Sequence, residues 1–189
     1  MKEEIARIIK ESISVKEEVL KTQSDTIAKI AELAIDCLKK QNKIILFGNG
    51  GSAADSQHIA AELVGRFQKD RQSLPAIALT TNTSVLTAIG NDYGFEYVFS
   101  KQIEGLGKKG DLAIGISTSG KAKNVIEAIK KAKALGLKTV GLTGCDGAGL
   151  AESADISLIV PSKVTARIQE SHITIGHIIC ELVEKSLFS

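Results

Sequence analysis

The chain has 189 residues, of which 43% are hydrophobic and 24% are charged, and its formal net charge is +2. This length suits one domain with or without an added arm, and the composition excludes a disordered chain. The near-neutral charge gives no electrostatic basis for nucleic-acid binding, and the absence of Trp with only 4% aromatic residues argues against base-stacking surfaces.

The cysteines and the charge pattern indicate which compartment the protein occupies. Cys37, Cys145 and Cys180 are far apart and show no CxxC spacing, so we expect buried thiols in a reducing cytoplasm and no disulfide framework. No apolar run reaches the roughly 20 residues that a membrane-spanning helix needs. The charged start Met1–Glu4 does not resemble a secretory signal. We therefore expect a cytoplasmic protein with no nucleic-acid or membrane partner.

Residues 1–40 are predicted to form an N-terminal helical arm. Apolar side chains recur there at helical spacing, and the segment contains neither Pro nor Gly, so one long or two consecutive amphipathic helices are expected. The segment carries no chemical motif, and we interpret it as an arm that covers the sheet or contacts another subunit. The periodic positions are Ile5, Ile8, Ile9, Ile27, Ile30, Leu33, Ala34, Cys37 and Leu38.

Residues 41–189 are predicted to form the main domain. Short apolar runs alternate there with helix-like segments, a pattern typical of a parallel sheet covered on both faces. The sequence thus predicts one α/β domain with a doubly wound, five-stranded parallel sheet. The strands are expected at Ile44–Phe47, Ala76–Leu79, Leu112–Ile116, Thr139–Leu142 and Ile156–Val160, and the helices near 53–67, 83–90, 121–135 and 165–187.

The segment Gly48–Asp55 follows the first predicted strand. Its glycines let the backbone approach a ligand, and a helix starting near Ser52 would point free N–H groups at it, so an anionic or polyhydroxyl ligand is expected. Gly48, Gly50 and Ala53 also match a loose dinucleotide-binding fingerprint. That alternative requires an acidic residue at the end of the second strand, and this sequence has none there.

The segment Ser117-Thr118-Ser119-Gly120 follows the third predicted strand, and a helix is expected to start directly after it. Three hydroxyls together with the N–H groups of a helix N-terminus suit a phosphate monoester, whereas simple N-capping needs only one hydroxyl. The GxxxxGK(S/T) pattern of nucleoside triphosphate sites is absent. The sequence therefore predicts a phosphate-binding loop.

Asp55, His58, Glu62 and Arg66 are spaced by 3, 4 and 4 residues and would form one polar ridge on the predicted helix 53–67. His58 and Glu62 could converge on one metal ion, or one could orient the other. The alternative is an exposed ladder of ion pairs, worth roughly a few tenths of a kcal/mol. The position behind the glycine-rich loop favours a functional role. The buried stripe beside the ridge is expected to consist of Ile59, Ala60, Leu63, Val64 and Phe67.

The last predicted helix, 165–187, is apolar on most sides and carries two of the three histidines, His172 and His177. We interpret His172 as a buried structural residue. A helix that is apolar on so many sides needs more cover than one small sheet provides. The sequence therefore also predicts a homo-oligomer.

Five motifs, found in order along nearly the whole chain, identify a family. Each is modest alone, but the set resembles the sugar isomerase (SIS) superfamily and, within it, the phosphoheptose isomerases. The resemblance implies a flavodoxin-like SIS domain that converts sedoheptulose 7-phosphate to D-glycero-D-manno-heptose 7-phosphate for bacterial heptose and lipopolysaccharide precursor synthesis. The motifs are Gly48–Ser52, His58-x-x-x-Glu62, Gly90–Gly94, Ser117–Gly120 and Arg167–Glu170 with His177.

The resemblance also implies partners and site residues. Family members are homotetramers with active sites shared between subunits, and some bind zinc through residues matching His58, Glu62, Gln169 and His177. Because Gln169 and His177 would be about 12 Å apart along one helix, their side chains must lean together, the helix must start late, or they come from different subunits. Substrate contacts carry over to Asn49, Gly50, Gly51, Ser52, Glu62, Arg66, Asn91, Asp92, Ser117, Thr118, Ser119 and Gln169.

An aldose–ketose isomerase needs a base for the carbon-bound proton and an acid for the oxygen. Our hypothesis gives Glu62 the base role and His177 the acid role in a reaction through a cis-enediol. A carboxylate that ligates zinc is a poorer base, so either Glu62 changes between roles or the metal polarises the carbonyl oxygen.

One residue differs from the family pattern, and one alternative function has to be considered. Several relatives have a phosphate-contacting Ser where this chain has Ala122, and the missing hydroxyl should weaken phosphate binding by roughly 0.5–1.5 kcal/mol. The rival is a non-catalytic SIS protein that binds the bacterial replication initiator. Such proteins lack an acidic residue at the position of Glu62 and a histidine at that of His177. This chain has both, which favours the enzyme.

Overall fold

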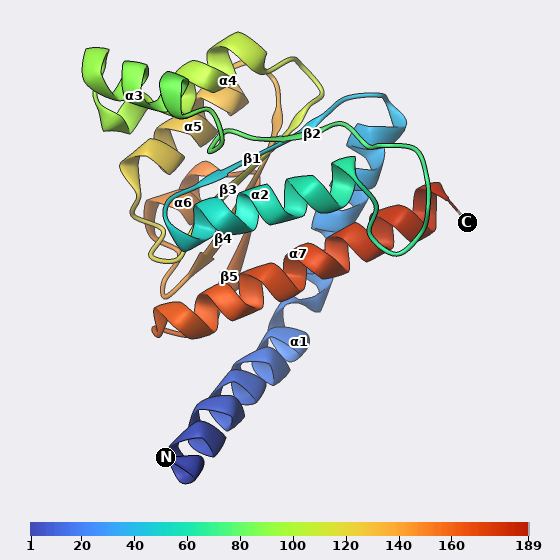
Figure 1. Ribbon diagram of the computed structural model, residues 1–189, viewed down its shortest axis with the longest axis vertical. Coiled ribbons are helices and arrows are strands. Elements are labelled where there is room, and N and C mark those ends of the chain that lie inside the picture. The colour runs from blue at the N-terminus through green and yellow to red at the C-terminus, as the bar shows by residue number, and fades with distance from the viewer. Residues whose placement is uncertain (189) are drawn as a thin grey trace.

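The computed structural model describes residues 1–188 and confirms the predicted α/β architecture (Figure 1). Five parallel strands form one sheet in the order β2-β1-β3-β4-β5, which is the flavodoxin-like arrangement. In the middle of the sheet, Ile44 lies opposite Ala76 on one side and Leu112 on the other. The strands are β1 (Ile44–Gly48), β2 (Ala76–Ala78), β3 (Leu112–Ser117), β4 (Lys138–Gly144) and β5 (Ile156–Val160).

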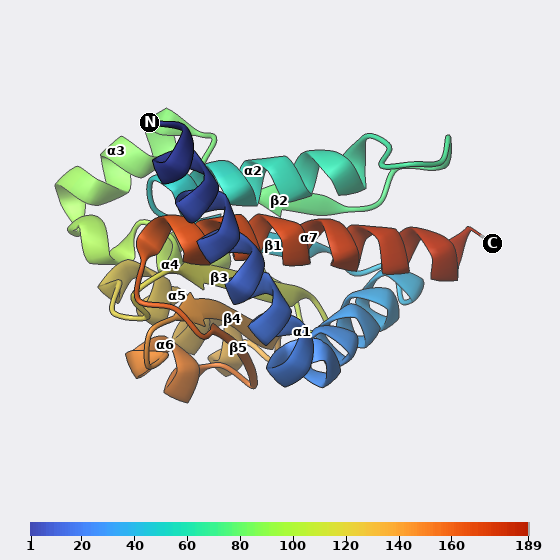
Figure 2. The same ribbon diagram turned by 90° about the horizontal axis from the view of Figure 1, so that it is seen from below.

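Helices cover both faces of the sheet (Figures 1 and 2). Ile44 and Leu46 of β1 pack into a core with helices α1, α2 and α7, whereas Ile45 and Phe47 pack into a second core with α4, α5 and α6. Successive residues of a strand point to opposite faces, so continuous apolar runs indicate cover on both. The helices are α1 (Lys2–Lys39), α2 (Gly51–Val64), α3 (Thr83–Asp92), α4 (Ser100–Leu106), α5 (Lys123–Ala134), α6 (Ala148–Ser153) and α7 (Thr165–Leu187), with a 3₁₀ turn η1 at Phe95–Tyr97.

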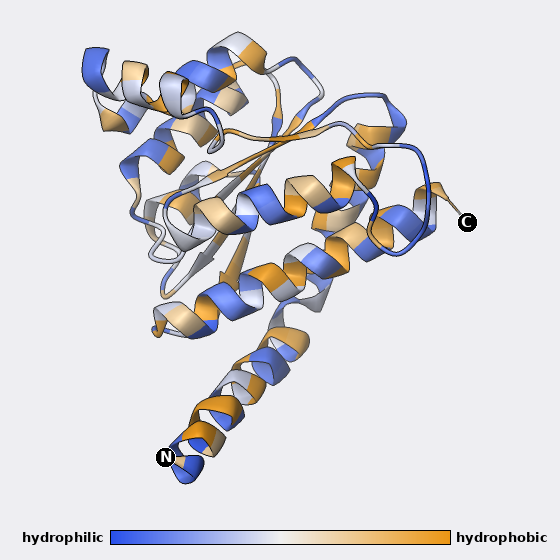
Figure 3. Ribbon diagram, in the orientation of Figure 1, coloured by the Kyte–Doolittle hydropathy of each residue, from blue (hydrophilic) through white to orange (hydrophobic). Residues whose placement is uncertain are grey.

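Helix α1 is one continuous helix, so the first of the two expected forms, one long helix or two consecutive helices, is confirmed. Its second half packs against α7 and β5 and buries Ile30 and Ala34 completely. Its first half projects beyond the domain and contains hydrophobic residues (Figure 3). Ile5, Ile9 and Ile13 are among them, each about half exposed. The domain boundary at residue 40 stays a prediction.

The cysteines agree with expectation at two positions. Cys37 and Cys180 are buried, and burial raises the pKa of their thiols to about 11 and about 12. The expectation of a buried Cys145 is wrong, because this residue lies in the loop after β4, where its φ is 57°. Within the described residues, none of the helices combines the length and the apolar character that crossing a bilayer requires.

His172 has the structural role expected for it. The side chain is completely buried, and its Nε2 lies 3.1 Å from the carbonyl oxygen of Thr143. Among the described residues, Nδ1 has no hydrogen-bond partner. Burial lowers the pKa of His172 from 6.5 to about 4, with the bond to Thr143 acting in the opposite direction. The folded protein therefore holds this imidazole in its neutral form.

Lowering the pH from 6.5 to about 4 is expected to remove about 3 kcal/mol of stability through His172. The unfolded chain takes up this proton near 6.5, while the folded chain resists it until about 4, so the free energy of unfolding falls as the pH falls across that window. Urea unfolding from pH 4 to 7 measures the slope. His172→Gln, which does not titrate, should flatten it, and an unchanged slope in this variant would contradict the assignment.

Candidate active site

The glycine-rich loop lies at the carboxyl end of β1 and leads into α2. Gly50 has a φ of 55°, a backbone conformation that favours glycine, and its carbonyl accepts the N–H groups of Ala53 and Ala54. The amide of Asn49 forms two hydrogen bonds with that of Asn124, each of 2.9 Å. The first turn of α2 thus starts directly in the glycine-rich loop at the carboxyl end of β1, where ligands bind in sheets of this type.

Gln169, on the first part of α7, covers the start of α2. A Cβ built on Gly51 would collide with the Gln169 side-chain amide, so a larger residue there would displace the end of that side chain. This placement brings the predicted substrate contacts Gly51 and Gln169 together. Helix α7 starts at Thr165 and contains both Gln169 and His177, which excludes a late helix start, and a metal site shared by these two residues stays a prediction.

The predicted phosphate loop follows β3 and is held against β4 and α6. The N–H of Gly144 donates to the Thr118 carbonyl (3.1 Å), and that of Leu150 donates to the Gly120 carbonyl (3.0 Å). Gly120 has a φ of 66°, and a Cβ there would collide with the Gly147 backbone. Ser117 is buried, and Ser119 is exposed. A loop fixed in this way presents its hydroxyl and N–H groups in a constant geometry.

Helix α5 begins later than expected, at Lys123 rather than directly after Gly120. Its N-cap residue is Ala122, which has extended backbone angles (φ −68°, ψ 108°) and no side-chain capping hydrogen bond. Ala122, where the family resemblance implies a Ser in several relatives, is therefore the cap of the helix that follows the phosphate loop.

Ala122→Ser is expected to stabilise the fold by about 1 kcal/mol, because a Ser at an N-cap accepts a hydrogen bond that Ala cannot. The added hydroxyl should also strengthen phosphate binding by a net hydrogen bond, roughly 0.5–1.5 kcal/mol. Thermal unfolding and the KM for a sugar phosphate measure the two effects separately. Ala122→Gly is the control, since it adds no hydroxyl. A Ser variant with the wild-type KM would contradict the assignment of this loop to phosphate.

A carboxylate and two imidazoles meet between α2 and α7. Nε2 of His58 lies 3.0 Å from Oε1 of Glu62 and 3.3 Å from Nε2 of His177. The Phe67 ring packs against the His177 ring with centroids 5.7 Å apart. The ligand atoms of His58, Glu62 and His177 all lie within 4.8 Å of one another. Two imidazole nitrogens that face each other at this distance need a proton or a cation between them, so the cluster suits proton transfer or metal binding.

The polar ridge is shorter than predicted because α2 ends at Val64. Arg66 lies beyond this end and is exposed, so the prediction of Arg66 on the same helix face as Glu62 is wrong. The predicted buried position of Val64 is also wrong, as this side chain is 45% exposed. The cause is Arg71, whose guanidinium donates to the carbonyl groups of Glu62, Leu63 and Gly65 and so occupies acceptors at the end of the helix.

Asp55 occupies the start of the same ridge and is partly buried. Burial raises the pKa of its carboxyl, while the nearby His58 acts in the opposite direction. Among the described residues, its Oδ2 has no hydrogen-bond partner.

Within one chain, Asn91 and Asp92 lie outside the cluster of His58, Glu62 and His177. They lie at the end of α3, are exposed, and are joined by a hydrogen bond of 2.8 Å. Helix α3 extends away from α2 and α7 (Figure 1). Their predicted contact with the substrate stays a prediction, as do the catalytic and metal-binding roles of the other site residues.

Comparison with known proteins assigns the chain to a family. The SIS domain family model matches residues 8–144. The phosphoheptose isomerase of Aquifex aeolicus is 55% identical over 98% of this chain and 97% of its own length, and that of Sulfurimonas denitrificans is 54% identical over 100% and 97%. The solved phosphoheptose isomerase of Neisseria gonorrhoeae superposes with a TM-score of 0.92 at 48% identity, covering 97% of this chain and 98% of that one. This chain belongs to the phosphoheptose isomerase family of SIS-domain proteins.

Proposed function

We propose that this chain interconverts sedoheptulose 7-phosphate and D-glycero-D-manno-heptose 7-phosphate. The observation that carries the proposal is the meeting of His58 and Glu62, on the helix that starts in the glycine-rich loop, with His177 of α7. Relatives that are 54–55% identical over nearly the whole chain bear the name phosphoheptose isomerase. In a bacterium, the product would supply heptose for lipopolysaccharide precursors.

Glu62 would act as the base and His177 as the acid in this reaction. A proton moves between C1 and C2 of the sugar through a cis-enediol, which requires a base at carbon and an acid at oxygen. Ser117, Thr118 and Ser119 would hold the phosphate with the N–H groups of the loop and of α5. Because the phosphate is remote from the reacting carbons, its binding energy can position the sugar for proton transfer.

We also propose that His58, Glu62 and His177 hold a zinc ion. Imidazole nitrogens and carboxylate oxygens are typical zinc ligands. The 3.3 Å between the two histidine nitrogens equals the separation of about 3.3 Å that two zinc–nitrogen bonds give at a tetrahedral angle. Zinc, when bound, would polarise the carbonyl oxygen of the sugar. Gln169 would serve as a fourth ligand, either from its own chain by leaning toward the cluster or from a second copy.

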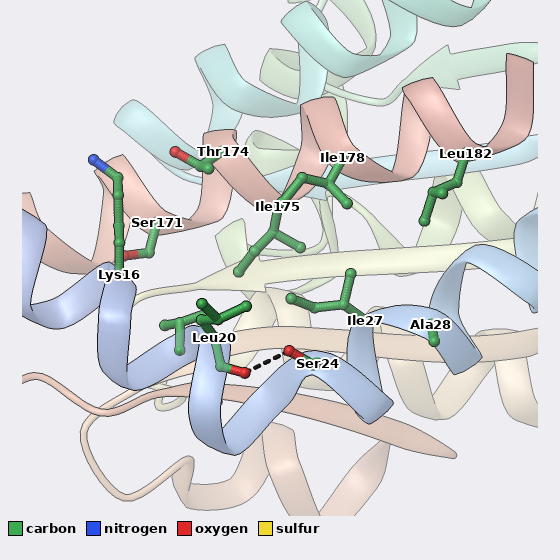
Figure 4. Close-up of a pocket in the computed structure, with 11 residues that line it drawn as sticks. Lys16, Leu20, Ser24, Ile27, Ala28, Ser171, Thr174, Ile175, Ile178 and Leu182 are labelled. Atoms are coloured by element: carbon green, nitrogen blue, oxygen red, sulfur yellow. Dashed lines mark hydrogen bonds between the residues drawn. The ribbon is translucent and has the colours of Figure 1, made fainter. Parts of the chain in front are cut away.

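We propose that the chain forms a homo-oligomer and, from its family resemblance, a homotetramer. The projecting half of α1 exposes Ile5, Ile9 and Ile13 by 51–54%, and a groove of about 290 Å³ runs between α1 and α7 (Figure 4). A second copy that covers these surfaces would remove their apolar side chains from water. Light scattering should give a multiple of the 20.0 kDa chain mass, and a mass of 20.0 kDa at micromolar concentration would contradict the assembly. The groove is lined by Leu20, Ile27, Ile175, Ile178 and Leu182, among others.

The cytoplasm is the compartment that we propose, supported by three free cysteines in a chain whose substrate is a phosphorylated sugar. Thiols stay reduced in that compartment.

Proton NMR of purified protein with sedoheptulose 7-phosphate tests the proposed reaction. We expect the anomeric signal of an aldose phosphate to appear, and a chelator to reduce its rate if zinc takes part. Folded, zinc-supplied protein that leaves the ketose unchanged would contradict the reaction. That outcome would favour the non-catalytic alternative, a protein that binds the replication initiator.

A further inference from the structure

Asn124 is buried in the first turn of α5, and among residues 1–188 it is the one hydrogen-bond partner of the Asn49 side chain. Nδ2 of Asn49 donates to Oδ1 of Asn124, and Nδ2 of Asn124 donates back to Oδ1 of Asn49, each at 2.9 Å. Asn124 is only 4% exposed. The two amides therefore form a closed ring of two hydrogen bonds, which we call the amide pair.

The amide pair lies where the direction of the chain connections reverses. β1 and β3 are neighbours in the sheet, yet β1 leads to α2 on one face while β3 leads to α5 on the other. In such sheets, ligands bind in the crevice at this reversal. Asn49 belongs to the glycine-rich loop on one side of the crevice. Asn124 belongs to the helix that follows the phosphate loop on the other side.

We propose that Asn124 is a positioning residue that fixes the glycine-rich loop relative to the phosphate loop. This inference rests on the proposed function, because the two loops would hold the two ends of one sugar phosphate. It also bears on the substrate contact predicted for Asn49. The pair uses one N–H of the Asn49 amide, so its second N–H remains available to a ligand, in a direction that Asn124 sets.

Replacement of Asn124 by Asp provides a pH-dependent test of the amide pair. A protonated carboxyl has one O–H donor and one C=O acceptor, so it can form the same two-bond ring with the Asn49 amide. An ionised carboxylate only accepts, which leaves its second oxygen facing Oδ1 of Asn49. Burial raises the pKa of a carboxyl, so the change falls within a range where the enzyme can be assayed. The nearest charged residues in sequence, Lys121 before α5 and Lys123 at its start, are exposed.

We expect the kcat/KM of Asn124→Asp, relative to wild type at each pH, to fall about tenfold or more between pH 5 and pH 8. Asn124→Leu has no donor or acceptor and should be impaired at every pH without recovery in acid. Asn82→Asp is the matched control, since Asn82 is an exposed N-cap of α3 and either residue caps a helix. Far-UV circular dichroism at each pH verifies folding.

A ratio for Asn124→Asp that stays constant from pH 5 to 8, in folded protein, would overturn the inference. If that variant does not fold, a double-mutant cycle with Asn49→Ala and Asn124→Ala replaces it. The combined loss should then equal the larger single loss, and losses that multiply would overturn the inference. Wild-type protein that is inactive on sedoheptulose 7-phosphate would instead overturn the proposed function, so the two failures are distinguishable.

Discussion

Glu62→Gln is expected to lower kcat by about 10²–10⁴-fold, the usual contribution of a general base. Gln has nearly the same size as Glu but does not take up a proton from carbon. Its amide can still occupy the space beside His58, which now lies 3.0 Å from the carboxylate. Sugar-phosphate binding should persist, because the phosphate loop is untouched. Calorimetric titration of the variant with sedoheptulose 7-phosphate measures that binding apart from turnover.

Glu104→Gln is the matched control for this substitution. Glu104 is an exposed carboxylate on α4, on the other face of the sheet from α2, and its replacement should leave kcat unchanged. Substantial turnover by Glu62→Gln would contradict the base assignment. Loss of both turnover and binding would indicate instead that Glu62 maintains the shape of the site.

Glu184→Gln is expected to lower the free energy of unfolding by about 3–5 kcal/mol, because it leaves the buried charge of Arg71 without its partner. Glu184 and Arg71 side chains are each 3% exposed and lie 3.2 Å apart. The carboxylate of Glu184 also accepts the N–H groups of Gln68 (2.9 Å) and Lys69 (2.8 Å). A Gln at this position retains one acceptor oxygen and turns two donors toward groups that are themselves donors.

Urea unfolding of Glu184→Gln against Glu181→Gln measures this effect. Glu181 lies on the same helix and makes an exposed ion pair with Lys185, so its replacement should cost less than about 1 kcal/mol. The backbone hydrogen bonds and Arg71 hold the pKa of Glu184 below 4.5 despite its burial, which by itself raises the pKa. This stabilisation is therefore present above pH 4.5 and is lost as the pH falls through the lowered value. Equal stability of the two variants would contradict the account.

The positions of the strands follow from local features of the sequence. All five strands appear where continuous apolar runs predict them, since a strand buried on both faces has no polar positions. The short helices α4 and α6 were not predicted, because seven and six residues span too few turns for a periodic pattern to show. The two ligand loops were found because glycines and hydroxyls follow directly after strands.

Parts of the site depend on contacts between distant residues, which one sequence does not reveal. Helix α2 ends at Val64 because Arg71 reaches back to its last carbonyl groups, and Arg71 is placed by Glu184, which is 113 residues away in sequence. The pairing of Asn49 with Asn124 likewise joins residues that are distant in sequence. The approach of His177 to His58 is predicted only by the family resemblance. In the structure, the two histidines meet because α7 packs beside α2.

Isomerisation of sedoheptulose 7-phosphate in heavy water tests the central claim, that side chains of this chain move a proton through an enediol. We predict that the aldose phosphate carries deuterium at C2, because the proton taken up by Glu62 exchanges with solvent before it returns to the sugar. Proton NMR detects the deuterium as a missing C2–H signal and a simplified anomeric signal. Complete conversion with no deuterium at C2 would contradict a solvent-exchangeable base, and no conversion by folded, zinc-supplied protein would contradict the proposed activity itself.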